Sequence, residues 1–186
     1  IKNSIFSNCH IEIEESLNIS LVNTKFENTI LQSWMFLDAI LIQCDFSVCR
    51  FSECTFINSK LEQCKFTASD LPNTVWTSTG LIEVEFIDSN LSQNCIVFDE
   101  DDNVVENIKG VHFRGSNLTK SNLQGLSLRR SDFSNCVMDG ANLNNADLRE
   151  SIFFNASAKE VLFSKANMLG ADCSNANLMS SIMSKT

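Results

Sequence analysis

Apolar residues recur every five positions along almost the whole chain. Every fifth residue over 6–96 is apolar except Ser16, and every fifth residue over 113–183 is apolar without exception. A small side chain stands two positions before most of these centres, with Trp34 among the exceptions. A period of five matches neither an α-helix nor a flat strand. It predicts short strands separated by corners, with one large and one small side chain of each unit pointing inward.

Four such units form a square coil of about twenty residues, so centres twenty apart should stack. In chain order we name the four sides the Phe face, the mixed face, the Trp face and the Leu face. Their centres in the first half are Phe6, Phe26, Phe46, Phe66, Phe86; Ile11, Leu31, Phe51, Leu71, Leu91; Phe36, Phe56, Trp76, Ile96; and Leu21, Leu41, Leu61, Leu81. The order returns after residue 110, which a sandwich of alternating strands does not explain.

At this level of detail the chain resembles a known family. The segments SNLTKSNLQG, ANLNNADLRES and KANMLGADCSNANL are similar to the A(D/N)LXX consensus of pentapeptide-repeat proteins. The resemblance is strong over 113–183 and looser before residue 96, where Cys, Ser and Thr replace Ala. It implies an all-β fold, a right-handed quadrilateral β-helix (solenoid), here of about nine coils. Function in this family is diverse, so the resemblance indicates a fold and not a role.

The two repeat blocks are out of frame with each other. Ile96 and Phe113 are 17 residues apart, and if Ile108 occupies the Leu face, seven residues must leave the coil at a corner. We place this corner insertion near residues 98–105. The sequence thus predicts one repeat domain over 1–186, with a first block at 1–97, an insertion loop at 98–107 and a second block at 108–186. Because the chain begins without Met, we expect a fragment of a larger protein.

The insertion is acidic and is a candidate interaction site. It carries four consecutive carboxylates, Asp99, Glu100, Asp101 and Asp102. Loops on a rigid scaffold often carry function, so a binding role and a solvated loop without a role are both open. A Ca²⁺ site is the third interpretation, although the run lacks the Gly and the closing Glu of an EF-hand loop.

A second candidate site is a group of apolar residues at positions where the repeat consensus is mostly polar. Its members are Met35, Leu37, Ile40, Ile42, Ile57, Val75 and Ile82, with Leu17 and Val22 also at non-core positions. A contiguous apolar patch indicates a contact surface for a protein partner, whereas the alternative is strand packing or an uncounted bulge. Trp34 stands nearby at a small-residue position, where it either distorts the coil or replaces several core contacts.

The formal net charge is −9 and is unevenly distributed. Residues 1–110 are acidic, but 111–186 hold eight Lys and Arg against six Asp and Glu. An acidic protein disfavours nonspecific contact with nucleic acid or an anionic membrane. No apolar run has the length of a membrane helix. We therefore expect neither direct nucleic-acid binding nor membrane insertion.

Catalytic chemistry is poorly represented. The two His are far apart, and His112 falls in an outward row of charges with Glu85 and Asp132 that we interpret as a surface charge ladder. Most of the eight Cys occupy inward positions, and Cys44 and Cys64 stack, so a bond between them is open. We interpret the cysteines as reduced core thiols, which is typical of a cytosol. The sequence predicts no catalytic site, cofactor or metal.

The favoured hypothesis is a non-enzymatic protein–protein interaction module or rigid scaffold. The resemblance implies arrays like those in bacterial secreted effectors and signalling proteins, with a cytoplasmic location (host cytosol for an effector). The strand edges at the ends predict cover by a flanking domain or an end-to-end homodimer. The alternative is a DNA-mimicking pentapeptide protein that binds DNA gyrase and modulates fluoroquinolone sensitivity. A spacer without binding surfaces is the third hypothesis.

Overall fold

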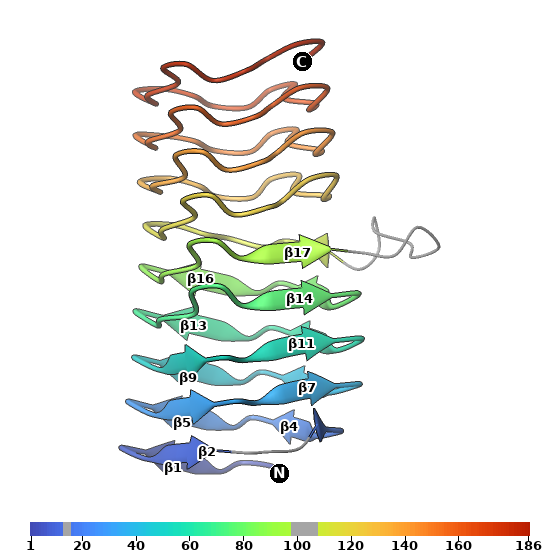
Figure 1. Ribbon diagram of the computed structural model, residues 1–186, viewed down its shortest axis with the longest axis vertical. Coiled ribbons are helices and arrows are strands. Elements are labelled where there is room, and N and C mark those ends of the chain that lie inside the picture. The colour runs from blue at the N-terminus through green and yellow to red at the C-terminus, as the bar shows by residue number, and fades with distance from the viewer. Residues whose placement is uncertain (13–15, 98–107) are drawn as a thin grey trace.

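The computed structural model describes residues 1–12, 16–97 and 108–186. Within these ranges the chain forms eighteen short β-strands and no helix, so none of the described residues forms a helix that could cross a membrane. All pairings between strands are parallel, and the chain winds into a square rod whose sides are the four faces defined above (Figure 1).

Each face of the first half is a sheet of stacked strands. The Phe face consists of β1 (Ile5–Ser7), β5 (Lys25–Glu27), β9 (Asp45–Ser47), β13 (Lys65–Thr67) and β16 (Glu85–Ile87). The mixed face consists of β2 (His10–Glu12), β6 (Ile30–Gln32) and β10 (Arg50–Ser52). The Trp face consists of β3 (Ser16–Leu17), β7 (Met35–Leu37), β11 (Thr55–Ile57), β14 (Val75–Thr77) and β17 (Cys95–Val97). The Leu face consists of β4 (Ser20–Val22), β8 (Ile40–Ile42), β12 (Lys60–Glu62), β15 (Gly80–Ile82) and β18 (Ile108–Lys109).

The predicted stacking of centres twenty residues apart is confirmed. Phe26 is in register with Phe6 and Phe46, and the ring centroids are 4.9 and 5.0 Å apart. Such a column fills the inside of the rod, because each three-residue strand turns its middle side chain inward. The rest of the core is built in the same way, with a buried large apolar side chain at nearly every centre. The family expectation of an all-β solenoid therefore holds.

The second half winds with less regular strand structure than the first. Its coils pair through single bridges, such as Asn117↔Val137 and Asp132↔Ile152, in place of three-residue strands. The reason is a tight turn after each centre: the Phe133 carbonyl, for example, accepts a hydrogen bond from the Cys136 N–H at 3.1 Å. Regular strands are thus stacked at most five deep, fewer than the nine coils that the sequence predicts.

The corners are turned by residues in the left-handed backbone region. Asn8 and Asn28 have φ of 54° and 48°, and their side chains form a ladder in which Asn28 Nδ2 donates to Asn8 Oδ1 at 2.8 Å. Asn tolerates this region better than most residues because its short polar side chain bonds locally. Asn is accordingly a frequent residue at these corners.

Trp34 is accommodated in the core. Its side chain is buried, and its indole N–H donates to the Ile11 carbonyl at 3.1 Å. The ring packs edge-on against Phe26 and at a tilt against Phe36. Of the two interpretations for this residue, the replacement of core contacts is the one that the structure supports.

The frame derived from the sequence is wrong by one residue at Ser16. Leu17 is in register with Phe36, and Ser16 with Met35, so the partners are 19 residues apart instead of twenty. In this register the backbone of Leu17, and not that of Ser16, pairs with a core centre. The exception at Ser16 in the five-residue pattern thus coincides with a pairing that is one residue shorter than the usual twenty.

The frame shift between the two blocks is also visible in the pairing. Trp76 pairs with Ile96 at the usual spacing of twenty, whereas Leu81 pairs with Ile108, a spacing of 27. The Phe column continues across this step, with ring centroids of Phe86 and Phe113 5.5 Å apart. Seven additional residues therefore fall between β17 and β18. Asp99, Glu100, Asp101 and Asp102 lie outside the described residues, and their role stays a prediction.

Candidate functional site

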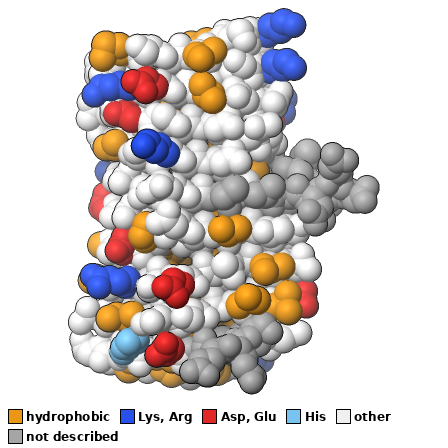
Figure 2. Space-filling model, in the orientation of Figure 1, with side chains coloured by type: hydrophobic (Ala, Val, Ile, Leu, Met, Phe, Trp, Pro, Cys, Tyr) orange, Lys and Arg blue, Asp and Glu red, His pale blue; other side chains and the backbone are white. Residues whose placement is uncertain are grey.

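On the Trp face, four of the predicted apolar residues lie close together. Met35 and Val75 are 41% and 39% exposed, whereas Leu37 and Ile57 are half-buried. Leu37 is in register with Ile57, and Thr55 stands between Met35 and Val75 in the neighbouring column. Figure 2 shows hydrophobic side chains gathered on this face at the height of β7, β11 and β14.

The other three predicted residues lie on the Leu face. Ile40 on β8 is 46% exposed and Ile42 on the same strand is half-buried, as is Ile82 on β15. Strand β12 lies between β8 and β15. Its outward side chains Lys60 and Glu62 form an ion pair, with Lys60 Nζ 3.0 Å from Glu62 Oε2. This pair separates Ile82 from Ile42.

One corner joins the two groups. Asp38 turns this corner with a φ of 50°, so Leu37 at the end of β7 and Ile40 at the start of β8 flank it. The structure thus places six of the seven residues on the two sides of this edge, with Thr55 between Met35 and Val75, and leaves Ile82 beyond the Lys60–Glu62 pair. We call these six the corner surface: Met35, Leu37, Ile40, Ile42, Ile57 and Val75.

The charges on the Phe face form a ladder along the rod axis. Lys65 is in register with Asp45 and Glu85, and its Nζ is 3.2 Å from the Glu85 carboxylate. His112 follows Glu85 in this row, and its Nδ1 accepts a hydrogen bond from the backbone N–H of Asp132 at 3.1 Å. The arrangement fits the interpretation of His112 as part of a surface charge ladder.

Other reactive groups are dispersed or buried in the described part of the chain. His10 lies on the mixed face, where its Nε2 is 3.0 Å from Gln32 Oε1, so the two His lie on different faces. No three His, Cys, Asp or Glu side chains of the described residues converge as metal ligands would.

Seven of the cysteines are free thiols: Cys9, Cys44, Cys49, Cys54, Cys64, Cys136 and Cys173. Burial raises the pKa of Cys49 and of Cys54 to about 11 and that of Cys136 to about 12. The neighbouring Cys44 thiol, together with burial, also raises the pKa of Cys64. Because a thiolate is the nucleophilic form, these side chains are inert near neutral pH and serve as core packing.

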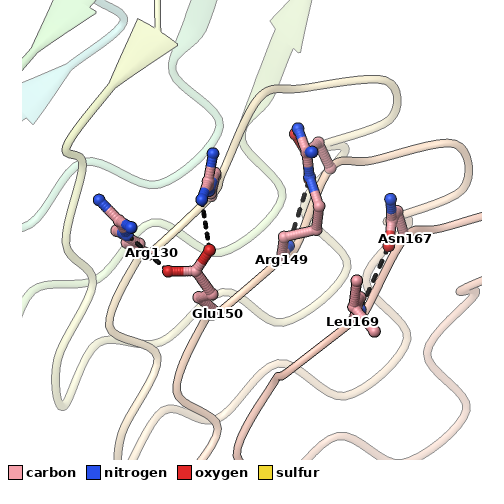
Figure 3. Close-up of polar contacts among 7 residues, drawn as sticks. Arg130, Arg149, Glu150, Asn167 and Leu169 are labelled. Atoms are coloured by element: carbon pink, nitrogen blue, oxygen red, sulfur yellow. Dashed lines mark hydrogen bonds and ion pairs between the residues drawn. The ribbon is translucent and has the colours of Figure 1, made fainter.

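A cluster of arginines on the Leu face of the second half was not predicted from the sequence (Figure 3). Glu150 accepts hydrogen bonds from Arg129 and, at 2.7 Å, from Arg130 Nε. Asp147 accepts from Arg149 Nε at 2.8 Å. The guanidinium groups hold the pKa values of both carboxyls below their usual range. The twenty-residue spacing of Arg129 from Arg149, and of Arg130 from Glu150, is the signal that was available in the sequence.

Comparison with known proteins places the fold among solved structures. Two trypsin-treated variants of QnrB1, a plasmid-mediated fluoroquinolone resistance protein, superpose with TM-scores of 0.64 and 0.62 at 14% and 15% identity; each match covers 95% of this chain and 90% of the other. HetL, a pentapeptide repeat protein involved in heterocyst differentiation regulation in the cyanobacterium Nostoc, aligns with a TM-score of 0.47 at 18% identity, over 98% of this chain and 89% of its own.

No curated protein matches the chain by sequence. The family model of pentapeptide repeats, however, matches in eight copies, over residues 38–67, 107–135, 116–153 and 159–186. These segments amount to more than half of the chain, and they include coils from both sides of the frame shift. The protein is therefore a member of the pentapeptide-repeat family.

Proposed function

We propose that this chain is a non-enzymatic protein-interaction module that presents the corner surface to a protein partner. The observation that carries the proposal is the exposure of Met35, Ile40 and Val75 around one edge of the rod. Apolar side chains at positions that face water are typical of a contact surface, because the free energy of the complex falls when a partner covers them.

The scaffold behind the corner surface supports this role. Phe36, Phe56 and Trp76 stack directly beneath it, with ring centroids 4.4 and 4.1 Å apart. Each strand is also hydrogen-bonded to strands above and below. Such a surface loses little conformational entropy when it binds, which favours affinity without large rearrangement.

Several features favour a binding role over a catalytic one. They also favour a reducing compartment as the location of the protein. The rod is filled by its own side chains, whereas an active site needs a concave pocket with convergent groups. The buried cysteines are free thiols, which is typical of cytosolic proteins. We accordingly propose a cytoplasmic interaction module of a bacterial effector or signalling protein, in the host cytosol for an effector.

The test is affinity capture followed by reconstitution with the purified partner. Met35→Glu/Ile40→Glu places two charges on the corner surface. Val137→Glu/Ile152→Glu is the matched control, because these apolar residues are 46% and 40% exposed but lie on the mixed and Phe faces. We expect the control to keep the partner and the corner variant to lose it. A partner that binds the folded corner variant with wild-type affinity contradicts the proposal.

A second candidate is the modulation of fluoroquinolone sensitivity by a DNA-like rod that binds gyrase. The overall likeness to the QnrB1 structures and the net charge of −9 favour it. The described carboxylates do not form one acidic face, however, and several are neutralised by pairs such as Arg50–Asp70 and Lys65–Glu85. A gyrase supercoiling assay with and without a fluoroquinolone tests it. No inhibition and no protection at micromolar protein eliminates this candidate.

A further inference from the structure

The Leu face of the second half concentrates positive charge on a protein whose net charge is −9. Arg129 and Arg149 follow the successive core centres Leu128 and Leu148, so they lie one above the other along the rod. Lys109 holds the same position in the coil below, and Arg130 stands beside Arg129 at the corner. We call these four residues the arginine surface: Lys109, Arg129, Arg130 and Arg149.

The arginines are oriented but not neutralised by their carboxylate neighbours. Glu150 fixes Arg129 and Arg130, and Asp147 fixes Arg149, so three guanidinium groups share two carboxylates. A guanidinium has five N–H donors. Within the described residues these contacts use one donor each from Arg129 and Arg130 and two from Arg149. Most donors therefore remain available, on side chains that are already held in place.

A hollow of about 300 Å³ adjoins these donors. Its lining comes from two consecutive coils, Ile108 to Gly110 below and Ser127 with the two arginines above. Gly110 turns the corner with a φ of 63° and adds no side chain to the space. Glu83 lies near Gly110, and its Oε2 accepts a hydrogen bond from Gln63 at 2.9 Å, but it is not among the residues that line the hollow. The hollow therefore presents mainly cationic groups to a ligand.

We propose that the arginine surface binds an acidic segment of a protein partner through paired carboxylates. The planar guanidinium fork matches a carboxylate in two parallel hydrogen bonds, which gives both strength and orientation. Donors from consecutive coils lie roughly 5 Å apart along the rod, the spacing of adjacent strands. Neighbouring Asp or Glu side chains of one segment can thus contact two coils at once.

The charge distribution favours an acidic protein segment over nucleic acid or an anionic membrane. The arginine surface extends over only a few coils, and the acidic remainder of the molecule repels an extended polyanion or a charged plane. A short peptide segment avoids this repulsion. The site is separate from the corner surface, so it does not depend on the function proposed above.

Fluorescence anisotropy with fluorescein-labelled hexaglutamate tests the proposal. We expect saturable binding at about 20 mM salt that weakens at physiological ionic strength, since exposed charges are screened. Arg129→Gln/Arg149→Gln should weaken binding roughly tenfold or more, because it removes two charge-assisted contacts. This variant leaves Arg130 on Glu150, and the thermal melt establishes that it is folded.

Arg114→Gln/Lys120→Gln is the matched control, since it removes the same charge from exposed positions outside the Leu face. It should change the affinity about twofold or less, the effect of net charge alone. Absence of saturable hexaglutamate binding to the wild type overturns the proposal, as does an equal loss in the control. Tighter, arginine-dependent binding of a thymidine oligonucleotide or of phosphatidylglycerol vesicles overturns the choice of a protein partner.

Discussion

Phe46 illustrates how single side chains stabilise the rod. It is fully buried, and its ring stacks between Phe26 and Phe66 with centroids 5.0 and 4.9 Å away. Phe51 of the adjacent face packs against it edge-on at 5.4 Å. Aromatic rings in these geometries attract each other beyond the area they bury. Phe46 therefore couples three successive coils.

Phe46→Ala should lower the free energy of unfolding by about 3–5 kcal/mol, because it opens a cavity within the column. Denaturant unfolding followed by circular dichroism measures the loss. Phe154→Ala is the control, since this side chain is 43% exposed and its removal should cost about 0.5 kcal/mol or less. Equal losses for the two variants would refute the assignment of the Phe column to the core.

The buried thiols should resist modification in the native protein. With pKa values of about 11 for Cys49 and about 12 for Cys136, the reactive thiolate is almost absent at pH 8 and increases only as the pH approaches these values. We expect iodoacetamide to label both residues slowly in buffer and rapidly in denaturant, with peptide mass spectrometry as the readout. Native labelling as fast as that of the less buried Cys9 would be the contrary result.

At the scale of the element, the corner is the unit that decides where the chain turns. A strand of three residues ends when the next residue enters the left-handed region, and this recurs at Asn8, Asn28 and Val48 with φ near 50°. A β-branched residue such as Val48 strains this conformation, and the stacked coils on either side hold it in place. Glycine relieves the strain at other corners.

Two glycine corners separate backbone strain from steric overlap. Gly125 has a φ of 73° and open space where a Cβ would stand, so Gly125→Ala should cost only the left-handed penalty of about 1–2 kcal/mol. At Gly115 an added Cβ would overlap Asp88 Oδ1, so Gly115→Ala should cost more. Thermal unfolding measures both. In the double variant with Asp88→Ala, the loss of melting temperature caused by Gly115→Ala should fall to that of Gly125→Ala. If it does not fall, the whole cost of Gly115→Ala lies in the backbone conformation.

At the scale of the whole molecule, the rod behaves as a stack in which each coil contacts its neighbours. The pairing steps by twenty residues through most of the chain and by 27 between β15 and β18. Stability in such solenoids is approximately a sum over coils and their interfaces. The two halves therefore form one continuous stack despite the change in frame.

Deletion of residues 99–105 should leave the stack intact, because it restores the spacing of twenty. We expect the β signal in circular dichroism to persist and the melting temperature to stay within a few degrees, since shortening a loop has a small entropic effect. Deletion of 99–107 is the control, because it leaves too few residues between Ile96 and Ile108 for a five-residue unit. A collapse of the β signal in the seven-residue deletion would mean that the insertion is structural.

The sequence contains most of the fold because the core period is local. Phe26 and Phe46 are neighbours in space because one coil contains twenty residues, so the spacing in the sequence places them in the same column. The shift at Leu17 was not predictable, because it becomes visible only in the register with Phe36. Surfaces for partners are harder to predict from the sequence, because the five-residue period constrains the inward residues and does not constrain the outward ones. The pairing of Arg130 with Glu150 joins two corner positions, where the five-residue period does not constrain the residue type.

The step of 27 residues at Ile108 shows that the number of residues in a coil can increase without increasing the height of that coil along the rod axis. Seven more residues enter the chain, yet Phe113 stacks on Phe86 as the next ring of the column. Position along the rod axis is therefore set by the number of coils and not by the number of residues. Duplicating one twenty-residue unit would displace every later side chain by about 4.8 Å along the axis without rotating it to another face. Binding residues on this protein can thus be repositioned in fixed increments, and corners can accept foreign loops at chosen heights.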